Sequence, residues 1–171
     1  MKNPLVWATL ALVSLPACSS LATNFDYDTT YDFVGLRKYS WVDKQDNSIS
    51  TKRVRDAVDA ELHQRGYEQV TANPDFQVAA YVSSKDRLSV VDWGYSPSPT
   101  GYWSHGHDIE VRQYVEGTLV LDIIDPRQNS LVWRASASKA VDRTWTPEER
   151  DAEVREAVGV LLAEFPPKKS R

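Results

Sequence analysis

The fold is decided by the stretch Tyr114-Val-Glu-Gly-Thr-Leu-Val-Leu-Asp-Ile-Ile-Asp125 and the answering run Leu131-Val-Trp-Arg-Ala-Ser-Ala137. Side chains alternate along a β-strand, so every second residue shares a face. One apolar face of the first run is made by Gly117, Leu119, Leu121 and Ile123. The matching face of the second run is made by Leu131, Trp133, Ala135 and Ala137.

The segment Pro126-Arg-Gln-Asn-Ser130 between the two runs has the composition of a turn. Two β-rich runs joined by a short turn predict an antiparallel hairpin. We therefore expect this hairpin to form the centre of the sheet. Asp122 and Asp125 are predicted to stabilise the strand end and the turn, where aspartate is common.

The whole chain has the size and composition of one modest domain. Its 171 residues, 42% of them hydrophobic, suffice for a single core. The net charge of −4 argues against nucleic acid as the main partner. The sequence has no phosphate-binding glycine loop, no serine elbow and no nucleophile with an evident base, so we expect neither catalytic activity nor a cofactor.

The N-terminus has the pattern of an exported, lipidated protein. The apolar run 5–15 matches the core of a signal peptide and is too short to span a bilayer. It ends in Leu15-Pro-Ala-Cys18, which resembles the bacterial lipobox. That resemblance implies that residues 1–17 are removed and that Cys18, the single cysteine, carries the lipid, palmitate included. The alternative is ordinary secretion with an incidental cysteine, but Leu15 suits the usual cleavage site poorly.

The residue after the cysteine gives the expected location. By the same resemblance, an aspartate at this position retains such proteins in the inner membrane, and this chain has Ser19 instead. We therefore expect an anchor in the outer membrane, with the domain on the periplasmic face. The expected division of the chain is a signal peptide at 1–17, a lipidated tether at 18–24, one domain at 25–167 and a basic tail at 168–171.

Two helices are predicted from apolar residues at helical spacing. The first begins near Ser50 or Thr51 and ends at Gly66, where a left-handed cap is expected. Its apolar stripe is Val54, Ala57, Val58 and Leu62. The second is opened by Thr146-Pro-Glu-Glu149, which combines a capping box with a proline at the first helical position. Its stripe is Val154, Ala157, Val158, Leu161, Leu162 and Phe165.

Further strands are expected on either side of the first helix. Phe25-Asp-Tyr-Asp28 alternates aromatic and acidic residues like a half-buried strand, and 38–42, 67–70 and 76–82 are the other candidates. Strands and helices do not alternate strictly along the chain. The predicted fold is therefore α+β: an antiparallel or mixed sheet, with two helices packed mainly on one face.

These elements resemble a bacterial lipoprotein family of unknown function, defined by the DUF4136 domain. The resemblance covers nearly all of the chain after the signal peptide and implies a fold and a location, but it brings no activity and no catalytic residues. The motifs that carry it are Phe25-Asp-Tyr-Asp28, Tyr39-Ser-Trp-Val42, Gly66-Tyr67, Asn73-Pro-Asp-Phe-Gln-Val78, Glu116-Gly-Thr-Leu-Val-Leu-Asp122, Leu131-Val-Trp-Arg134 and Phe165-Pro-Pro167.

Residues Asp86 to Asp108 are predicted to form a long loop, because glycine, proline and serine are mixed there with aromatics. Aromatic side chains with a polar edge serve glycan or protein contacts. The candidate contact surface is Trp93, Tyr95, Tyr102 and Trp103. The alternative is that these four side chains fold back over the sheet as a lid.

The same loop holds the ligand-like cluster of His105, His107 and Asp108. Two imidazoles and a carboxylate suit zinc, nickel or copper. A metal site also needs a rigid frame and further ligands, which the sequence does not supply, so no metal is expected. His63 is predicted to be a surface residue, and Asp26, Asp28 and Asp32 are predicted to be solvated.

Three classes of function stay open at this point. The first is a binding or structural lipoprotein that contacts an envelope protein or a cell-wall glycan. The second is a periplasmic protein that binds a metal or small ligand through the Asp86–Asp108 loop. The third, an envelope hydrolase, is least favoured because no catalytic constellation is present.

Replacing Cys18 by serine tests the predicted anchor. Cys18→Ser removes the thiol that would be acylated, so labelling by a fatty-acid probe should disappear and uncleaved precursor should accumulate. Labelling and processing are followed on gels. Unchanged labelling in the variant would exclude Cys18 as the lipid attachment site.

Overall fold

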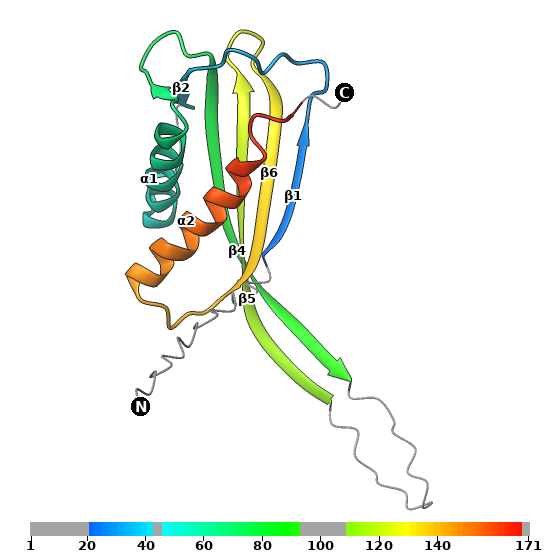
Figure 1. Cartoon of the computed structure of the whole chain (residues 1–171). Coiled ribbons are helices and arrows are strands. Elements are labelled where there is room, and N and C mark those ends of the chain that lie inside the picture. The colour runs from blue at the N-terminus through cyan, green and yellow to red at the C-terminus, as the bar shows by residue number, and fades with distance from the viewer. Residues whose placement is uncertain (1–20, 43–45, 93–108, 169–171) are drawn as a thin grey trace, which may run out of the picture.

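The structure is a computed structural model, and it describes residues 21–42, 46–92 and 109–168. Six strands form one sheet and two helices accompany it (Figure 1). In chain order the elements are β1 (Ala22–Tyr27), β2 (Lys38–Trp41), α1 (Ile49–Gln64), β3 (Glu68–Gln69), β4 (Phe76–Asp92), β5 (Ile109–Asp125), β6 (Ser130–Val141) and α2 (Pro147–Ala163).

The sheet is mixed, with the strand order β1-β6-β5-β4-β2-β3. The neighbours β1, β6, β5 and β4 pair antiparallel. Strand β2 pairs parallel with both of its neighbours, β4 and β3. The two helices pack on one face of this sheet and against each other (Figure 1). The predicted α+β fold class is therefore confirmed.

The predicted hairpin is β5 and β6; β5 is one of the two middle strands, whereas β6 lies next to the edge strand β1, so the hairpin is not the exact centre of the sheet. Leu119, Leu121 and Ile123 face the core and are at most 8% exposed. In the turn, an oxygen of the buried Asp125 accepts the Arg127 backbone N–H at 2.8 Å, so Asp125 has its predicted role. Asp122 instead pairs across the strands, where its carboxylate accepts two hydrogen bonds of 2.6 Å from the Arg134 guanidinium.

The predicted inward face of β6 is wrong at one residue. Leu131 is 46% exposed, whereas its neighbour Val132 is only 2% exposed. The cause is a bulge: Ile123 pairs with Trp133 and Ile124 pairs with Leu131, which leaves Val132 as an extra residue. An extra residue reverses the alternation of faces beyond it. The Val132 carbonyl accepts a hydrogen bond from the Asp28 N–H at 2.9 Å.

Strand β1 begins at Ala22, so it includes residues 22–24 that were assigned to the tether. It pairs with β6 alone and forms the edge of the sheet. Its side chains are exposed except for the half-exposed Tyr27, and Phe25 is 48% exposed. The expectation of a half-buried strand is therefore wrong, because neither helix covers this edge (Figure 1).

The start of α2 and the glycine that follows α1 are as predicted, whereas α1 begins at Ile49, slightly before the expected Ser50 or Thr51. The Ser48 side chain caps α1 by accepting the Thr51 N–H, and Gly66 follows the helix with a φ of +84°. Thr146 and Glu149 form the complete capping box of α2. The predicted stripes are confirmed as buried, with Val154 and Ala157 only partly so.

An aromatic cluster (Phe165, Trp133, Phe76, Tyr67) joins the end of α2 to the sheet. The Phe165 ring lies 5.4 Å from the rings of both Trp133 and Phe76, and 5.9 Å from that of Tyr67. All four side chains are at most 8% exposed. Ring pairs in these geometries add stability beyond the area that they bury. The cluster therefore fixes α2 at its C-terminal end.

Strands β4 and β5 extend well past the rest of the sheet. β6 pairs with β5 only from Val115 onward, and β2 pairs with β4 only at residues 76–78. Beyond these points β4 and β5 continue as a two-stranded ribbon that leaves the body of the domain (Figure 1). Residues 86–92 are therefore strand, and the prediction of loop there is wrong. The β-branched pair Val90–Val91 favours a strand, and the glycine- and proline-rich composition begins only after it.

Trp133→Ala should lower the free energy of unfolding by about 3–5 kcal/mol, because the side chain is fully buried in the aromatic cluster. Leu131→Ala, on the same strand but 46% exposed, is the matched control and should cost far less. Thermal and denaturant unfolding measure both. Melting of the Trp133 variant within a few degrees of the unmutated chain would contradict the packing described above.

Candidate binding groove

The helices are too short to cover the sheet that they pack on. With 16 and 17 residues they are each about 25 Å long. β4 and β5 have 17 residues each and extend about 56 Å. The helix C-termini lie at the aromatic cluster, so the uncovered part of the sheet lies toward the helix N-termini (Figure 1). A groove of about 610 Å³ opens there between the sheet and both helices.

The floor of the groove is apolar and belongs to the sheet. Val82, Leu119 and Ala137 are neighbours across β4, β5 and β6, since Leu119 pairs with the other two. Val141 closes the floor beside Gly117, where an added Cβ would lie only 2.6 Å from Val141 Cγ2. A side chain at this position would therefore force the Val141 side chain to move.

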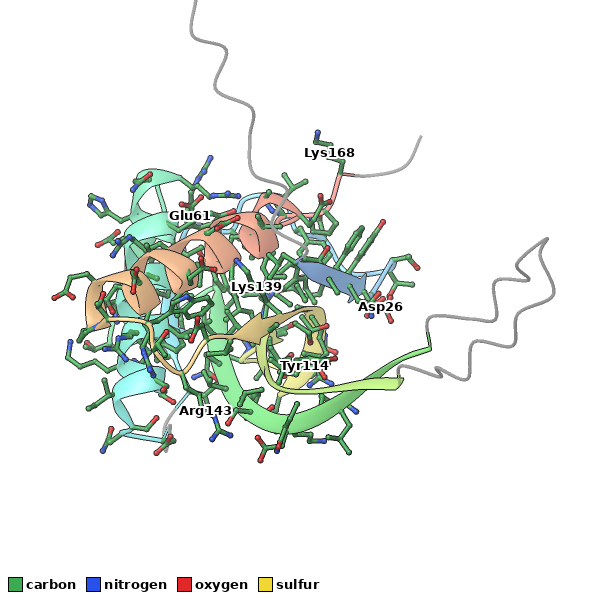
Figure 2. The ribbon with its side chains drawn as sticks, turned by 90° about the horizontal axis from the view of Figure 1, so that it is seen from below. Asp26, Glu61, Tyr114, Lys139, Arg143 and Lys168 are labelled. Carbon is green, nitrogen blue, oxygen red and sulfur yellow. The ribbon has the colours of Figure 1, made fainter. Side chains whose placement is uncertain are left out.

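The rim of the groove is rich in basic residues. It contains five of them, Arg53, Lys85, Lys139, Arg143 and Arg150, against the acidic pair Asp86 and Glu153. The lining is therefore positive, although the chain as a whole has a net charge of −4. Figure 2 looks at the domain from below and shows Lys139 between β6 and α2, with Arg143 on the connection that follows β6.

Ion pairs tie the walls of the groove to one another. Arg53 Nε of α1 lies 2.5 Å from Asp151 Oδ1 of α2, and Lys139 pairs with Glu153. Arg143 Nη2 lies 2.6 Å from Asp86 Oδ1 of β4. Within the described part of the chain, Lys85 is the rim cation that has neither an ion pair nor a side-chain hydrogen bond.

Trp145 forms part of the wall between β6 and α2. Lys139 Nζ lies 5.9 Å from the centre of its ring, and the Arg150 side chain donates hydrogen bonds of 3.0 Å to the carbonyl oxygens of Trp145 and Arg143. Asp142 fixes the turn before it by accepting the Thr144 hydroxyl and N–H, and these bonds lower the pKa of Asp142. The connection is therefore held in place by its own polar contacts.

Away from the groove, part-buried polar contacts join α1 to β2. Asp59 Oδ1 on α1 accepts hydrogen bonds of 2.8 Å from the Tyr39 hydroxyl and from Trp41 Nε1, both on β2. Burial, with the bond to Asp59, raises the pKa of Tyr39 well above its usual range. Burial likewise raises the pKa of Tyr67. These shifts follow from core packing and from the bond that clamps α1 to β2.

The family model for DUF4136, a domain of unknown function, matches residues 23–167. The chain belongs to the DUF4136 family. The match includes all eight elements of the fold apart from the first residue of β1, and it contains the whole of the groove except Leu21. The comparison with curated proteins finds no match.

Solved structures align with this chain at low sequence identity. A PDZ domain protein from Parabacteroides distasonis ATCC 8503 aligns with a TM-score of 0.59 and 12% identity, over 86% of this chain and 36% of that one. The DUF4136 chain thus spans about a third of that protein. The PelC dodecamer from Paraburkholderia phytofirmans aligns with a TM-score of 0.48 and 10% identity, over 84% of this chain and 95% of that one. The first similarity shows the fold alone.

The site residues predicted from the sequence of this DUF4136 chain lie outside the described residues. They are Cys18, Trp93, Tyr95, Tyr102, Trp103, His105, His107 and Asp108. Among residues 21–42, 46–92 and 109–168, no group of three or more His, Cys, Asp or Glu side chains is placed to hold a metal ion. Neither α1 nor α2 is long and apolar enough to cross a membrane.

The remaining polar candidates have local roles. His63 is exposed on α1, as predicted. Asp26, Asp28 and Asp32 are exposed, and the last two accept hydrogen bonds from Thr30 and Val34 within their own turn. The bonds from Thr30 lower the pKa of Asp28. These carboxylates therefore stabilise the turn after β1, in agreement with the solvated role expected for them.

Sequence reasoning missed the groove itself. The apolar residues of its floor continue the alternation of the core strands. From the sequence, Val82 and Leu119 therefore cannot be distinguished from ordinary core residues. One available signal was the length of the strand-forming segments compared with that of the helices. A second was the run Lys139, Arg143 and Arg150, which concentrates positive charge in an acidic chain.

The pair Arg53–Asp151 should contribute little to stability. Its side chains are 23% and 43% exposed, and such pairs are worth about 0.2–1 kcal/mol. A double-mutant cycle with Arg53→Gln and Asp151→Asn measures the coupling energy, which should fall as salt is added. The exposed pair Lys52–Asp56 on α1 is a control for general effects of salt. A coupling energy well above this range, unchanged by salt, would show that the pair rigidly fixes the helices.

Proposed function

We propose that this DUF4136 protein is a lipoprotein, anchored through Cys18 in the outer membrane, with a binding or structural role at the periplasmic face. The observation that carries the proposal is the sequence Leu15-Pro-Ala-Cys18 at the end of a short apolar run. Acyl chains contribute about 0.8 kcal/mol for each buried CH₂ group, and two or more chains hold a protein on a membrane stably. A soluble periplasmic domain would then remain at the membrane surface.

The position of the chain start is compatible with such an anchor. Leu21 lies at the end of the domain where the groove opens, and it lines that groove. Cys18 precedes it by three residues, which span at most about 11 Å. An anchor on Cys18 would thus hold the groove and the start of the β4–β5 ribbon near the bilayer.

The proposed role is binding without catalysis, and it needs no cofactor. A partner for the aromatic residues between β4 and β5 would be an envelope protein or a cell-wall glycan, because aromatic side chains with polar edges suit both. The described residues add a second candidate, a small-ligand-binding periplasmic protein. The groove of about 610 Å³ favours it, since ligand pockets commonly measure 300–1,000 Å³.

The outer-membrane location is tested by moving the retention signal into the sequence. Ser19→Asp introduces the aspartate that retains lipoproteins in the inner membrane, so the protein should move from outer- to inner-membrane fractions on a density gradient. Ser20→Asp adds the same charge one residue later and is the matched control. An unmutated protein in the inner-membrane or soluble fraction would contradict the proposal.

A further inference from the structure

We propose that the groove binds one anionic phospholipid of the membrane in which the protein is anchored, with an acyl chain on the floor and the phosphate at the basic rim. This inference rests on the proposed function and names a ligand for it. Three features of the groove carry the inference: its floor, its rim and the short separation in sequence between its Leu21 and Cys18.

The part of the floor on β5 and β6 offers apolar surface without free backbone groups. Leu119 and Ala137 belong to β5 and β6, which have paired strands on both sides at these positions. Their N–H and C=O groups are therefore engaged within the sheet. A peptide added as a strand would need such groups free, whereas an acyl chain needs none. This central part of the floor thus fits a hydrocarbon chain better than an extended peptide, whereas Val82 lies on β4, which pairs only with β5 beyond Val78.

The rim supplies charge of the right sign. Lys85 has no ion-pair partner among the described residues, and basic residues outnumber acidic ones along the lining. The N-terminal turn of α1 contains no acidic residue, and Ser48 and Ser50 line the groove, although the nearby Asp46 accepts the Ser48 N–H. Lysine and arginine are the usual partners of phosphate in proteins. A neutral lipid would leave this charge unused.

The anchor would place membrane lipids beside the groove. Leu21 lines it, and the three residues back to Cys18 span at most about 11 Å. A tethered protein meets its neighbours at high effective concentration, so even weak affinity would suffice for occupancy. The anchor's own acyl chain is a competing occupant, but it carries no negative charge for the rim.

Photo-crosslinking in nanodiscs tests the proposal with the full processed chain, anchor included. The probe is phosphatidylglycerol with a diazirine on one acyl chain, in a phosphatidylcholine background, and adducts are mapped by mass spectrometry of peptides. We expect adducts on residues 82–86, 115–119 and 137–141. Lys85→Glu should lower the yield at least about fivefold, the effect of one cationic contact at a membrane surface. Lys38→Glu, an exposed lysine on β2 outside the groove, should leave it unchanged.

A second pair of variants tests the floor independently of the rim. Val82 and Tyr81 are adjacent and exposed on β4, but Val82 lines the groove and Tyr81, by alternation, faces away from it. Val82→Glu should abolish the adducts and Tyr81→Glu should not. Equal labelling by a diazirine phosphatidylcholine probe, adducts spread over the whole domain, or unchanged yields in both groove variants would overturn the proposal.

The outcomes also separate this inference from the proposed function. Fatty-acid labelling of Cys18 without groove adducts would contradict the phospholipid site but would still support the proposal that the protein is a lipoprotein. A diazirine fatty acid incorporated at Cys18 that crosslinks into the groove would make the anchor's own chain the occupant, and the proposal would be wrong. Absence of the protein from membrane fractions would contradict both the lipid anchor and the phospholipid site.

Discussion

The packing of Phe165 against Trp133, Phe76 and Tyr67 is the contact on which the rest of the structure depends. It joins four separate segments of the chain: the second residue after α2, strand β6, the start of β4 and the third residue after α1. Because α2 is fixed at this end, it crosses the sheet from the aromatic cluster toward the groove (Figure 1). Its N-terminal half is held by ion pairs, which are weaker and more easily rearranged than a dry aromatic core.

The two ends of the domain therefore differ in character. At one end, buried rings and the bonds of Asp59 to Tyr39 and Trp41 hold the elements together, and the hollow lined by Tyr67 and Pro166 measures about 290 Å³, less than half the volume of the groove. At the other end, strands of about 56 Å continue past helices of about 25 Å, and the resulting groove has an apolar floor and a positive rim. The described part of the chain begins at this open end, with Leu21. The groove, its basic rim and Leu21 all lie at this end of the domain. The proposed lipid site follows from their proximity.

Local patterns predicted most of the fold. The helix stripes, the capping box at Thr146 and the β5–β6 hairpin follow from spacing and capping chemistry, and all are present. The exposed Leu131 was not predictable in this way, because a bulge depends on how β5 and β6 pair. Residues 86–92 were misassigned because their strand is stabilised by a partner some 20 residues further along the chain. The groove arises because β4 and β5 are much longer than the helices that cover the sheet. This difference in length is visible only when the elements are compared with one another. Cys18 and the aromatic residues between β4 and β5 lie outside the described part, so their predicted roles rest on sequence alone.

In the proposed arrangement, the open end of the domain faces the bilayer. Hydrogen–deuterium exchange of the anchored full chain, in nanodiscs with and without anionic phospholipid, measures which end lies at the membrane. Amides in residues 82–86 and 115–119 should exchange more slowly when the anionic lipid is present, with no change around Tyr67 and Phe165. Protection at the aromatic end, or in the turn of residues 28–37 beside it, would show that the domain faces the membrane the other way.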